Sequence, residues 1–273
     1  MKEDSLPRRP VPVLVRDAAE EQRGSFFHLG IVSEKGNRPA PNQDVSGWVW
    51  AGELSIGVGI ADGMGGHKAG ERASWLALGA ALQTLAGQSE TVSPRERLAQ
   101  AFLGAWRALN EEAKHDPAVR GMGTTLTLVW LENRQAYFGH VGDCRLYVVK
   151  GKECKLLTED HTLASELEKT GTPLFSREEL SGCRHVLTRC LSPMHEAAPD
   201  IDSLSIEPPF RLILVTDGIY PWLAVKEATF LLTDDSPLAA AEKLVRIARE
   251  RGGTDDRTAC VMDVFEPTDE KLS

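Results

Sequence analysis

Short apolar runs separated by turn residues dominate the hydrophobic pattern of the chain. Residues 26–32 (FFHLGIV), 45–50 (VSGWVW) and 54–61 (LSIGVGIA) are runs of this kind, and a second block of them extends through 123–157. β-Branched and aromatic residues bounded by turn signals are typical of strands. We therefore expect two blocks of strands.

Two helices are expected between these blocks. Residues 68–86 are rich in Ala and Leu, and residues 93–115 begin with Ser93-Pro94. A serine N-cap followed by proline at the first helical position is a common helix start. In the second helix apolar residues recur at helical spacing, and we expect them to face the core: Leu98, Phe102, Trp106 and Leu109.

The C-terminal half repeats this mixture of elements. We expect a short helix in 162–171, a buried strand at 211–215, a helix near 236–251 and a last strand at 258–264. Strands in hairpins, with helices inserted in pairs, predict antiparallel sheets covered by helices and not a regular parallel sheet. The expected fold class is therefore mixed α/β (α+β).

No linker rich in Pro, Gly or Ser divides the chain of 273 residues, so we expect one folded domain over 26–267. Residues 1–25 mix charges and prolines, and we interpret them as a flexible N-terminal tail. A docking segment is the alternative, because VPVLV lies within them. Residues 268–273 are expected to be a short C-terminal tail.

Composition and charge disfavour several classes of function. The net charge is −9 with no concentrated basic run, so neither nucleic acid nor an acidic membrane surface is an expected partner. No apolar stretch approaches the ~20 residues of a membrane span, and no secretory signal is visible. The five cysteines form neither a CxxC pair nor a dense framework, which predicts reduced thiols and a cytoplasmic location.

Two apolar runs end abruptly in an aspartate followed by glycine, namely Asp62-Gly63 and Asp217-Gly218. Aspartate is disfavoured in strands, and a buried carboxylate needs a partner or a metal. Glycine beside it lets backbone carbonyls approach a ligand closely. Either pair alone is an ordinary turn signal, but together they favour a divalent-cation site.

Further acidic signals lie at Asp44, Asp143, Asp160 and Asp255-Asp256. Carboxylates, carbonyls and water suit Mg²⁺ or Mn²⁺, whereas zinc prefers closely spaced Cys and His. Two such cations can lower the pKa of a bridging water and stabilise a displacement at phosphorus. The aspartates therefore indicate phosphoester hydrolysis, with a purely structural cation-binding module as an alternative.

Eight ordered motifs carry a family resemblance: RPAPNQD, ADGMGGHKAGERAS, GMGTTLTLV, HVGDCRLYVV, LTEDHT, VLTRCLS, LVTDGIY and GGTDDRTA. In these motifs the chain resembles the metal-dependent type 2C protein Ser/Thr phosphatases (the PPM family), especially their compact bacterial members. The resemblance extends from about residue 27 to 265. It implies an α-β-β-α four-layer sandwich of two mainly antiparallel sheets flanked by helices.

The resemblance also implies roles for single residues. Asp62 resembles the carboxylate that bridges two metals, and Gly63 would add its backbone carbonyl. Asp217 and Asp255 would complete the second metal's shell. Asp160, with Asp217, resembles a weaker third-metal site.

The remaining implied roles concern the reaction itself. Asp44 would hold metal-bound water by hydrogen bonding, Arg38 lies near the family's phosphate-binding arginine, and His67 resembles the proposed general acid. Residues 172–186 would form the variable flap beside the site.

The activity implied by the resemblance is direct hydrolysis of phosphoserine or phosphothreonine by a metal-activated bridging water, without a covalent phosphoenzyme. Two core Mn²⁺ or Mg²⁺ ions are expected, with a weaker third. We expect no Cys-x5-Arg nucleophile loop. The implied partners are phosphorylated Ser/Thr proteins, including a Hanks-type kinase and its targets, and a monomer is expected.

Four positions depart from the family's pattern; one is Cys190, where a small residue is more usual, and the other three concern the site. Gln43 stands where Glu is common, Arg38 lies one residue farther from Asn42 than usual, and Asp256 replaces an amide. Together they leave one alternative open, a catalytically weak phosphate-sensing or docking regulator with the same fold.

Overall fold

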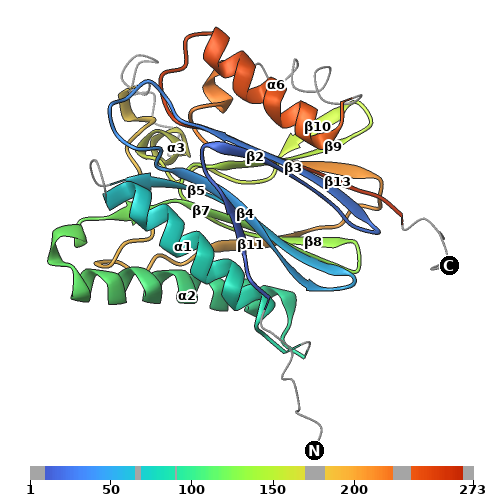
Figure 1. The fold of residues 1–273 in the computed structure, drawn as a ribbon, viewed down its shortest axis with the longest axis horizontal. Helices are drawn as coiled ribbons and strands as arrows, with labels where there is room; N and C mark the ends of the chain where they lie inside the picture. The colour runs from blue at the N-terminus through green and yellow to red at the C-terminus, as the bar shows by residue number, and fades with distance from the viewer. Residues whose placement is uncertain (1–9, 65–68, 90, 170–181, 224–234, 267–273) are drawn as a thin grey trace, which may run out of the picture.

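The computed structural model describes residues 10–64, 69–89, 91–169, 182–223 and 235–266. Two β-sheets are stacked face to face, and helices cover their outer faces (Figure 1). Helices α1 (Ala69–Ala86) and α2 (Pro94–His115) cover the first sheet, and α6 (Pro237–Glu250) covers the second. The expected α-β-β-α sandwich is confirmed.

Every strand pairing between the described residues is antiparallel. The first sheet has the order β1-β4-β5-β7-β8-β11, with β6 paired to β5, and the second has the order β10-β9-β12-β13-β3-β2. The strands are β1 Val13–Val15, β2 Ala18–Arg23, β3 Phe27–Glu34, β4 Asp44–Gly52, β5 Ser55–Met64, β6 Gly123–Thr124, β7 Leu126–Glu132, β8 Gln135–Val141, β9 Arg145–Lys150, β10 Glu153–Leu156, β11 Asp200–Leu204, β12 Phe210–Val215 and β13 Arg257–Val264. The shorter helices are α3 Leu163–Lys169 and the 3₁₀ turns η1 Pro117–Val119 and η2 Tyr220–Trp222.

Three apolar layers hold the sandwich together. The central one lies between the sheets and includes Leu29 and Ile31 of β3 and Val58 and Ile60 of β5. The second lies between the first sheet and α1 and α2, and the third lies under α6. Full burial of one such side chain contributes about 1.5–3 kcal/mol, so these layers dominate the stability.

The helix boundaries agree with the sequence signals. Ser93 Oγ accepts a hydrogen bond from the Glu96 N–H at the start of α2, and Ser236 caps α6 in the same way. The predicted stripe of α2 faces the first sheet, with Leu98, Phe102 and Leu109 buried and Trp106 half-buried. None of the helices in the described ranges is long and apolar enough to cross a membrane.

The expectation of a flexible tail is wrong for part of residues 1–25. Residues 13–15 form β1, which pairs with β4, and residues 18–23 form β2, which pairs with β3. The sequence AAEEQR hides β2 because this strand lies at a sheet edge with most of its side chains in solvent. Its pairing comes from backbone groups, which leave no hydrophobic pattern. Residues 1–9 and 267–273 lie outside the described ranges.

Candidate metal centre

Four of the predicted aspartates lie at one end of the sandwich, because four strands begin or end there. Asp44 opens β4 and lies opposite Asp62 near the end of β5. Asp217 follows the end of β12, and Asp255 precedes β13, which pairs with β12. The two sheets thus bring together carboxylates that are far apart in the chain.

A threonine links the two sheets at this end. Thr216 Oγ1 donates a hydrogen bond of 2.7 Å to Asp44 Oδ2 and accepts one of 3.1 Å from the Thr258 N–H. Asp44 is only 1% exposed, so this hydroxyl fixes a buried carboxylate. Threonine at 216 therefore orients the side chain of Asp44.

Burial and mutual repulsion raise the pKa of these carboxyls. Burial raises the pKa of Asp62 well above its usual range, and neighbouring Asp44, Asp217 and Asp143 raise it further. Burial likewise raises the pKa of Asp44 to about 7, although the Thr216 hydrogen bond opposes this rise. The pKa of Asp217 is raised for the same main reason. A cluster of this kind is stabilised by cations, which reverse the sign of the local potential.

The donor set fits Mg²⁺ or Mn²⁺ better than zinc. Within the described ranges, no group of three or more His, Cys, Asp or Glu side chains is arranged so that it could hold a metal ion by itself. Mg²⁺ typically binds one or two carboxylates and keeps several waters, so an open carboxylate site suits it.

Gly63 is required by a close contact with α1. A Cβ atom at this position would lie 1.9 Å from the Gly70 carbonyl oxygen. The Gly63 N–H donates a hydrogen bond of 3.0 Å to the Gln43 carbonyl, so the turn after Asp62 is held on both sides. The glycine identified from the sequence thus lets three backbone segments meet beside the carboxylates.

Arg38 lies at the same end, as the sequence predicts. Its guanidinium forms an ion pair with Asp255, a carboxylate that is 38% exposed. The positive charge of Arg38 also lowers the pKa of Asp62 and Asp217, against the effect of burial. Arg38 therefore lies within electrostatic reach of the cluster despite its shifted spacing.

Asp256 anchors the segment that carries Arg38, a role that the sequence did not indicate. Its two carboxylate oxygens accept the N–H groups of Gly36 at 2.7 Å and Gln43 at 2.8 Å. Asp256 is only 5% exposed. In the sequence, Asp256 stands out only as an additional negative charge beside Asp255. The tertiary structure alone brings the N–H groups of Gly36 and Gln43 to its carboxylate.

The surroundings of Asp160 disfavour a role in metal binding. Arg145 binds the Asp160 carboxylate through Nη2 at 2.7 Å and Nε at 3.0 Å, and its guanidinium stacks 3.8 Å from the Tyr220 ring centroid.

Asp143 is a better candidate than Asp160 for binding a cation. Its side chain is 5% exposed, and burial and the charge of Asp217 raise its pKa to about 7. The sequence could have indicated Asp143 as a candidate ligand, because it follows β8 and Gly142, and the other aspartates also adjoin glycine at strand ends. Gly142 has φ +110°.

Part of the predicted site lies outside the described residues. This applies to His67 and to residues 172–181 of the expected flap. In the described remainder of the flap, His185 Nδ1 lies 3.8 Å from Asp217 Oδ2. A cavity of about 600 Å³ adjoins this point and is lined by Arg145, Asp160, Arg184, His185 and Tyr220 among others.

The sequence analysis expects no Cys-x5-Arg nucleophile loop, but the spacing itself does occur, between Cys183 and Arg189. Arg189 is engaged by two hydrogen bonds to Asp200, at 2.7 and 3.1 Å. The N–H groups of Val186 and Thr188 donate to protein carbonyls. The guanidinium and two of the amides that a phosphate-binding loop would use are thus already engaged within the protein, which disfavours a cysteine nucleophile loop here.

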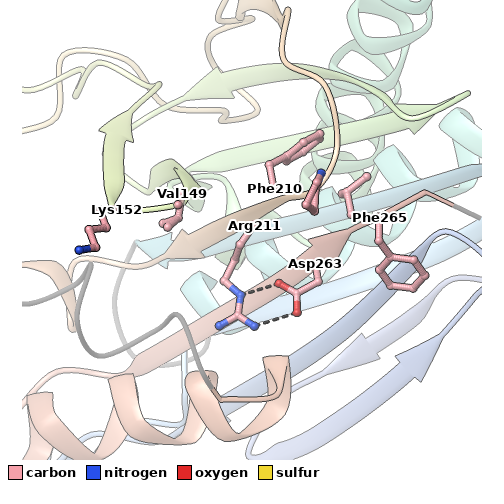
Figure 2. A pocket seen from close by; sticks show the side chains of 9 residues that line it. Val149, Lys152, Phe210, Arg211, Asp263 and Phe265 are labelled. Atoms are coloured by element: carbon pink, nitrogen blue, oxygen red, sulfur yellow. Dashed lines mark hydrogen bonds and ion pairs between the residues drawn. The ribbon is translucent and has the colours of Figure 1, made fainter.

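A second cavity, of about 560 Å³, lies at the opposite end of the second sheet (Figure 2). Val149, Phe210 and Phe265 line it, and Arg211 forms a two-fold ion pair with Asp263 at its wall. These residues lie at the ends of β9, β12 and β13 that point away from the aspartates. This cavity is therefore separate from the carboxylate cluster.

Comparison with known proteins agrees with this geometry. The sequence pattern of the protein phosphatase 2C family matches residues 35–255. Protein phosphatase PhpP of Streptococcus pneumoniae is 32% identical over 245 residues, which are 88% of this chain and 98% of that protein. Serine/threonine protein phosphatase PstP of Mycobacterium tuberculosis is 30% identical over 236 residues, which are 86% of this chain and 44% of that protein.

Solved structures give the same result. The crystal structure of PstP/Ppp from M. tuberculosis superposes with a TM-score of 0.78 at 28% identity and covers 88% of this chain and 100% of that one. The catalytic domain of PstP in complex with two manganese ions superposes with a TM-score of 0.76 at 29% identity, with coverage of 88% and 99%.

Proposed function

The chain belongs to the protein phosphatase 2C family and is a protein serine/threonine phosphatase, and we propose that its carboxylate cluster performs the hydrolysis with two divalent cations. The observation that carries this proposal is the group of carboxyls with raised pKa values at one end of the sandwich. Such a group is costly in a fold unless cations neutralise it.

The proposed ligands are the carboxylates of Asp62, Asp217 and Asp255 and the carbonyl of Gly63. Mn²⁺ and Mg²⁺ both suit these oxygen donors. When bound, the two cations would supply an activated bridging water and neutralise charge on the phosphoryl group. A weaker third cation would bind beside Asp143 and Asp217; this replaces the expectation for Asp160, whose carboxylate is paired with Arg145.

The other residues would orient the reactants. Asp44, held by Thr216, would accept a proton from the attacking water and direct its oxygen toward phosphorus. Arg38 would exchange its ion pair with Asp255 for the substrate phosphate, and His67 would protonate the leaving alkoxide. No covalent phosphoenzyme is needed.

We also propose the setting of the enzyme. Its substrates would be proteins phosphorylated on Ser or Thr, among them a Hanks-type kinase and its targets, and it would act as a cytoplasmic monomer. The five cysteines are free thiols, which agrees with a reducing compartment.

The test is hydrolysis of para-nitrophenyl phosphate and a phosphothreonine peptide in EDTA, Mg²⁺ or Mn²⁺. Asp62→Asn should lower kcat by at least about 100-fold, since loss of a single group that stabilises transition-state charge costs about 10²–10³ in kcat, and Asp62 would hold the cations that do so here. Asp202→Asn, an exposed change on β11, is the matched control. Turnover that is independent of metal, or a fully active Asp62→Asn protein, would refute the assignment. A folded wild type that binds Mn²⁺ without turnover would support the regulatory alternative.

A further inference from the structure

The turn between β1 and β2 lies beside the catalytic end of the sandwich. In the first sheet Val15 is opposite Ser46, and in the second Ala18 is opposite Ser33. The turn residues, Arg16-Asp17, therefore cross from one sheet to the other next to the start of β4. Both strands precede residue 35, where the match to the family pattern begins.

Arg16 connects the start of β4 to the start of α1. Its Nε donates a hydrogen bond of 2.8 Å to the Asp44 carbonyl, and its Nη2 donates to the Glu71 carbonyl at 3.0 Å and to Ser74 Oγ at 2.8 Å. Ser74 Oγ in turn donates to the Gln43 carbonyl at 2.6 Å. The Arg16 side chain is only 11% exposed. One guanidinium thus holds two consecutive carbonyls of the segment that leads into β4, one directly and one through Ser74.

Asp17 holds the other side of the same segment. Its Oδ1 accepts a hydrogen bond of 2.8 Å from Asn42 Nδ2, and Asn42 Oδ1 accepts the Asp44 N–H at 3.0 Å. Asn42 is 1% exposed. Asp17 has φ +50°, a left-handed conformation that persists only where surrounding contacts require it.

We propose that Arg16 and Asp17 are positioning residues that hold Asp44 in its catalytic orientation. The proposal rests on the role of Asp44 in the proposed function. Arg16 fixes the Asp44 carbonyl, Asp17 fixes its N–H through Asn42, and Thr216 fixes its carboxylate. Misplacement of a reacting group by about 1 Å can lower a rate by about 10²-fold, so loss of these contacts should reduce turnover without affecting substrate binding.

The first test compares full-length Arg16→Met with Arg23→Met. Arg23 is an exposed residue of β2, so its replacement is a matched change in the same arm. With para-nitrophenyl phosphate at saturating Mn²⁺, Arg16→Met should lower kcat at least about tenfold and change KM less than about twofold. Arg23→Met should match the wild type.

The second test replaces Asp17 and therefore still tests the proposal if Arg16→Met does not fold. Asp17→Gly removes the acceptor and retains the left-handed backbone without strain, whereas Asp17→Asn retains an acceptor oxygen. We expect Asp17→Gly to lower kcat several-fold and Asp17→Asn to restore most of it. In both tests, hydrogen exchange of the peptide that contains Asp44 should accelerate in the impaired variants and not in Arg23→Met.

Folded Arg16→Met and Asp17→Gly proteins with a kcat within about twofold of the control would overturn the proposal. Equal losses in Asp17→Gly and Asp17→Asn would also contradict it. A wild type without Mn²⁺-dependent turnover would refute the proposed function instead. If the wild type has no such turnover, hydrogen exchange still tests the positioning role. An unchanged exchange rate of the Asp44 peptide in Arg16→Met and Asp17→Gly would refute that role, and a faster rate would support it.

Discussion

At the scale of single residues, the role of an acidic side chain near the candidate metal centre depends on the groups that it contacts. Asp160 and Asp143 are both acidic residues near strand ends, yet Asp160 is neutralised by Arg145 and Asp143 is buried against Asp217. Asp256 is a third case, since its carboxylate serves the backbone of residues 36 and 43. Asparagine cannot reproduce that bonding, because its amide presents one acceptor and one donor.

Asp256→Asn should therefore destabilise the fold by about 1–3 kcal/mol, the usual cost of leaving a buried donor unpaired. Removing its charge also reduces repulsion with Asp44, and this would oppose the effect. The measurement is therefore urea denaturation at about pH 5.5 in EDTA, where Asp44, with its pKa of about 7, is mostly protonated. Asp202→Asn is the control, and equal unfolding midpoints in the two variants would show that the two hydrogen bonds contribute nothing.

At the scale of elements, the strand ends at the site pack so closely against neighbouring backbone that only glycine fits there. Gly63 lies against α1, and Gly218 lies against the segment before β13, where a Cβ would be 1.8 Å from the Asp256 carbonyl. The Asp-Gly pairs thus combine a carboxylate with a turn that a second element can approach closely.

Gly63→Ala should shift β5 away from α1, because the new methyl group would overlap the Gly70 carbonyl. Overpacking of this kind costs about 1–3 kcal/mol, and here the obstructing atom belongs to the backbone. Gly121→Ala is the matched control, since no atom lies within 4 Å of a Cβ at that position. Guanidinium denaturation should show a clear loss of stability for Gly63→Ala and a change within about 0.5 kcal/mol for Gly121→Ala. Similar curves would mean that the turn relaxes freely.

At the scale of the whole molecule, the carboxylate cluster makes the fold depend on pH and on cations. The pKa of Asp143 in the fold is about 7, whereas an unfolded Asp has a pKa of about 4. Between these values the folded state keeps a proton that the unfolded state releases, so stability falls as pH rises. The contribution of protonated Asp143 is thus complete below about pH 4 and lost as the pH passes through about 7.

Asp143→Asn should remove this pH dependence, because its neutral amide does not titrate. In EDTA, the stability of the variant relative to the wild type should rise by about 2–4 kcal/mol between about pH 4.5 and 8. Thermal unfolding of both proteins across this range measures the difference. Saturating Mn²⁺ should reduce it, because cations bind the ionised form. Parallel pH profiles in EDTA would contradict the burial of Asp143 among like charges.

The local pattern of apolar and polar residues predicted much of the fold, and the aspartates at the ends of apolar runs predicted much of the site. The helix at 93–115 and the strand at 211–215 were predicted almost to the residue, as α2 and β12 show. Asp62 and Asp217 were identified because two apolar runs each end in an aspartate followed by glycine, and the two pairs together favour a cation site. β2 was missed because an edge strand with mostly exposed side chains carries no hydrophobic alternation, and β1 was missed because its apolar run is only three residues long.

The sequence by itself determined where most of the helices and the core strands form and that several carboxylates favour a cation site, because these properties depend on residues that are close together in the chain. Only the tertiary structure decided which partner each charged or polar group has. Thr216 meets Asp44 across 172 positions, and Gly36 meets Asp256 across 220. Contacts this distant arise from the stacking of the two sheets, and hydrogen bonds to backbone groups, such as those of Arg16 and Asp256, leave no trace in side-chain pattern.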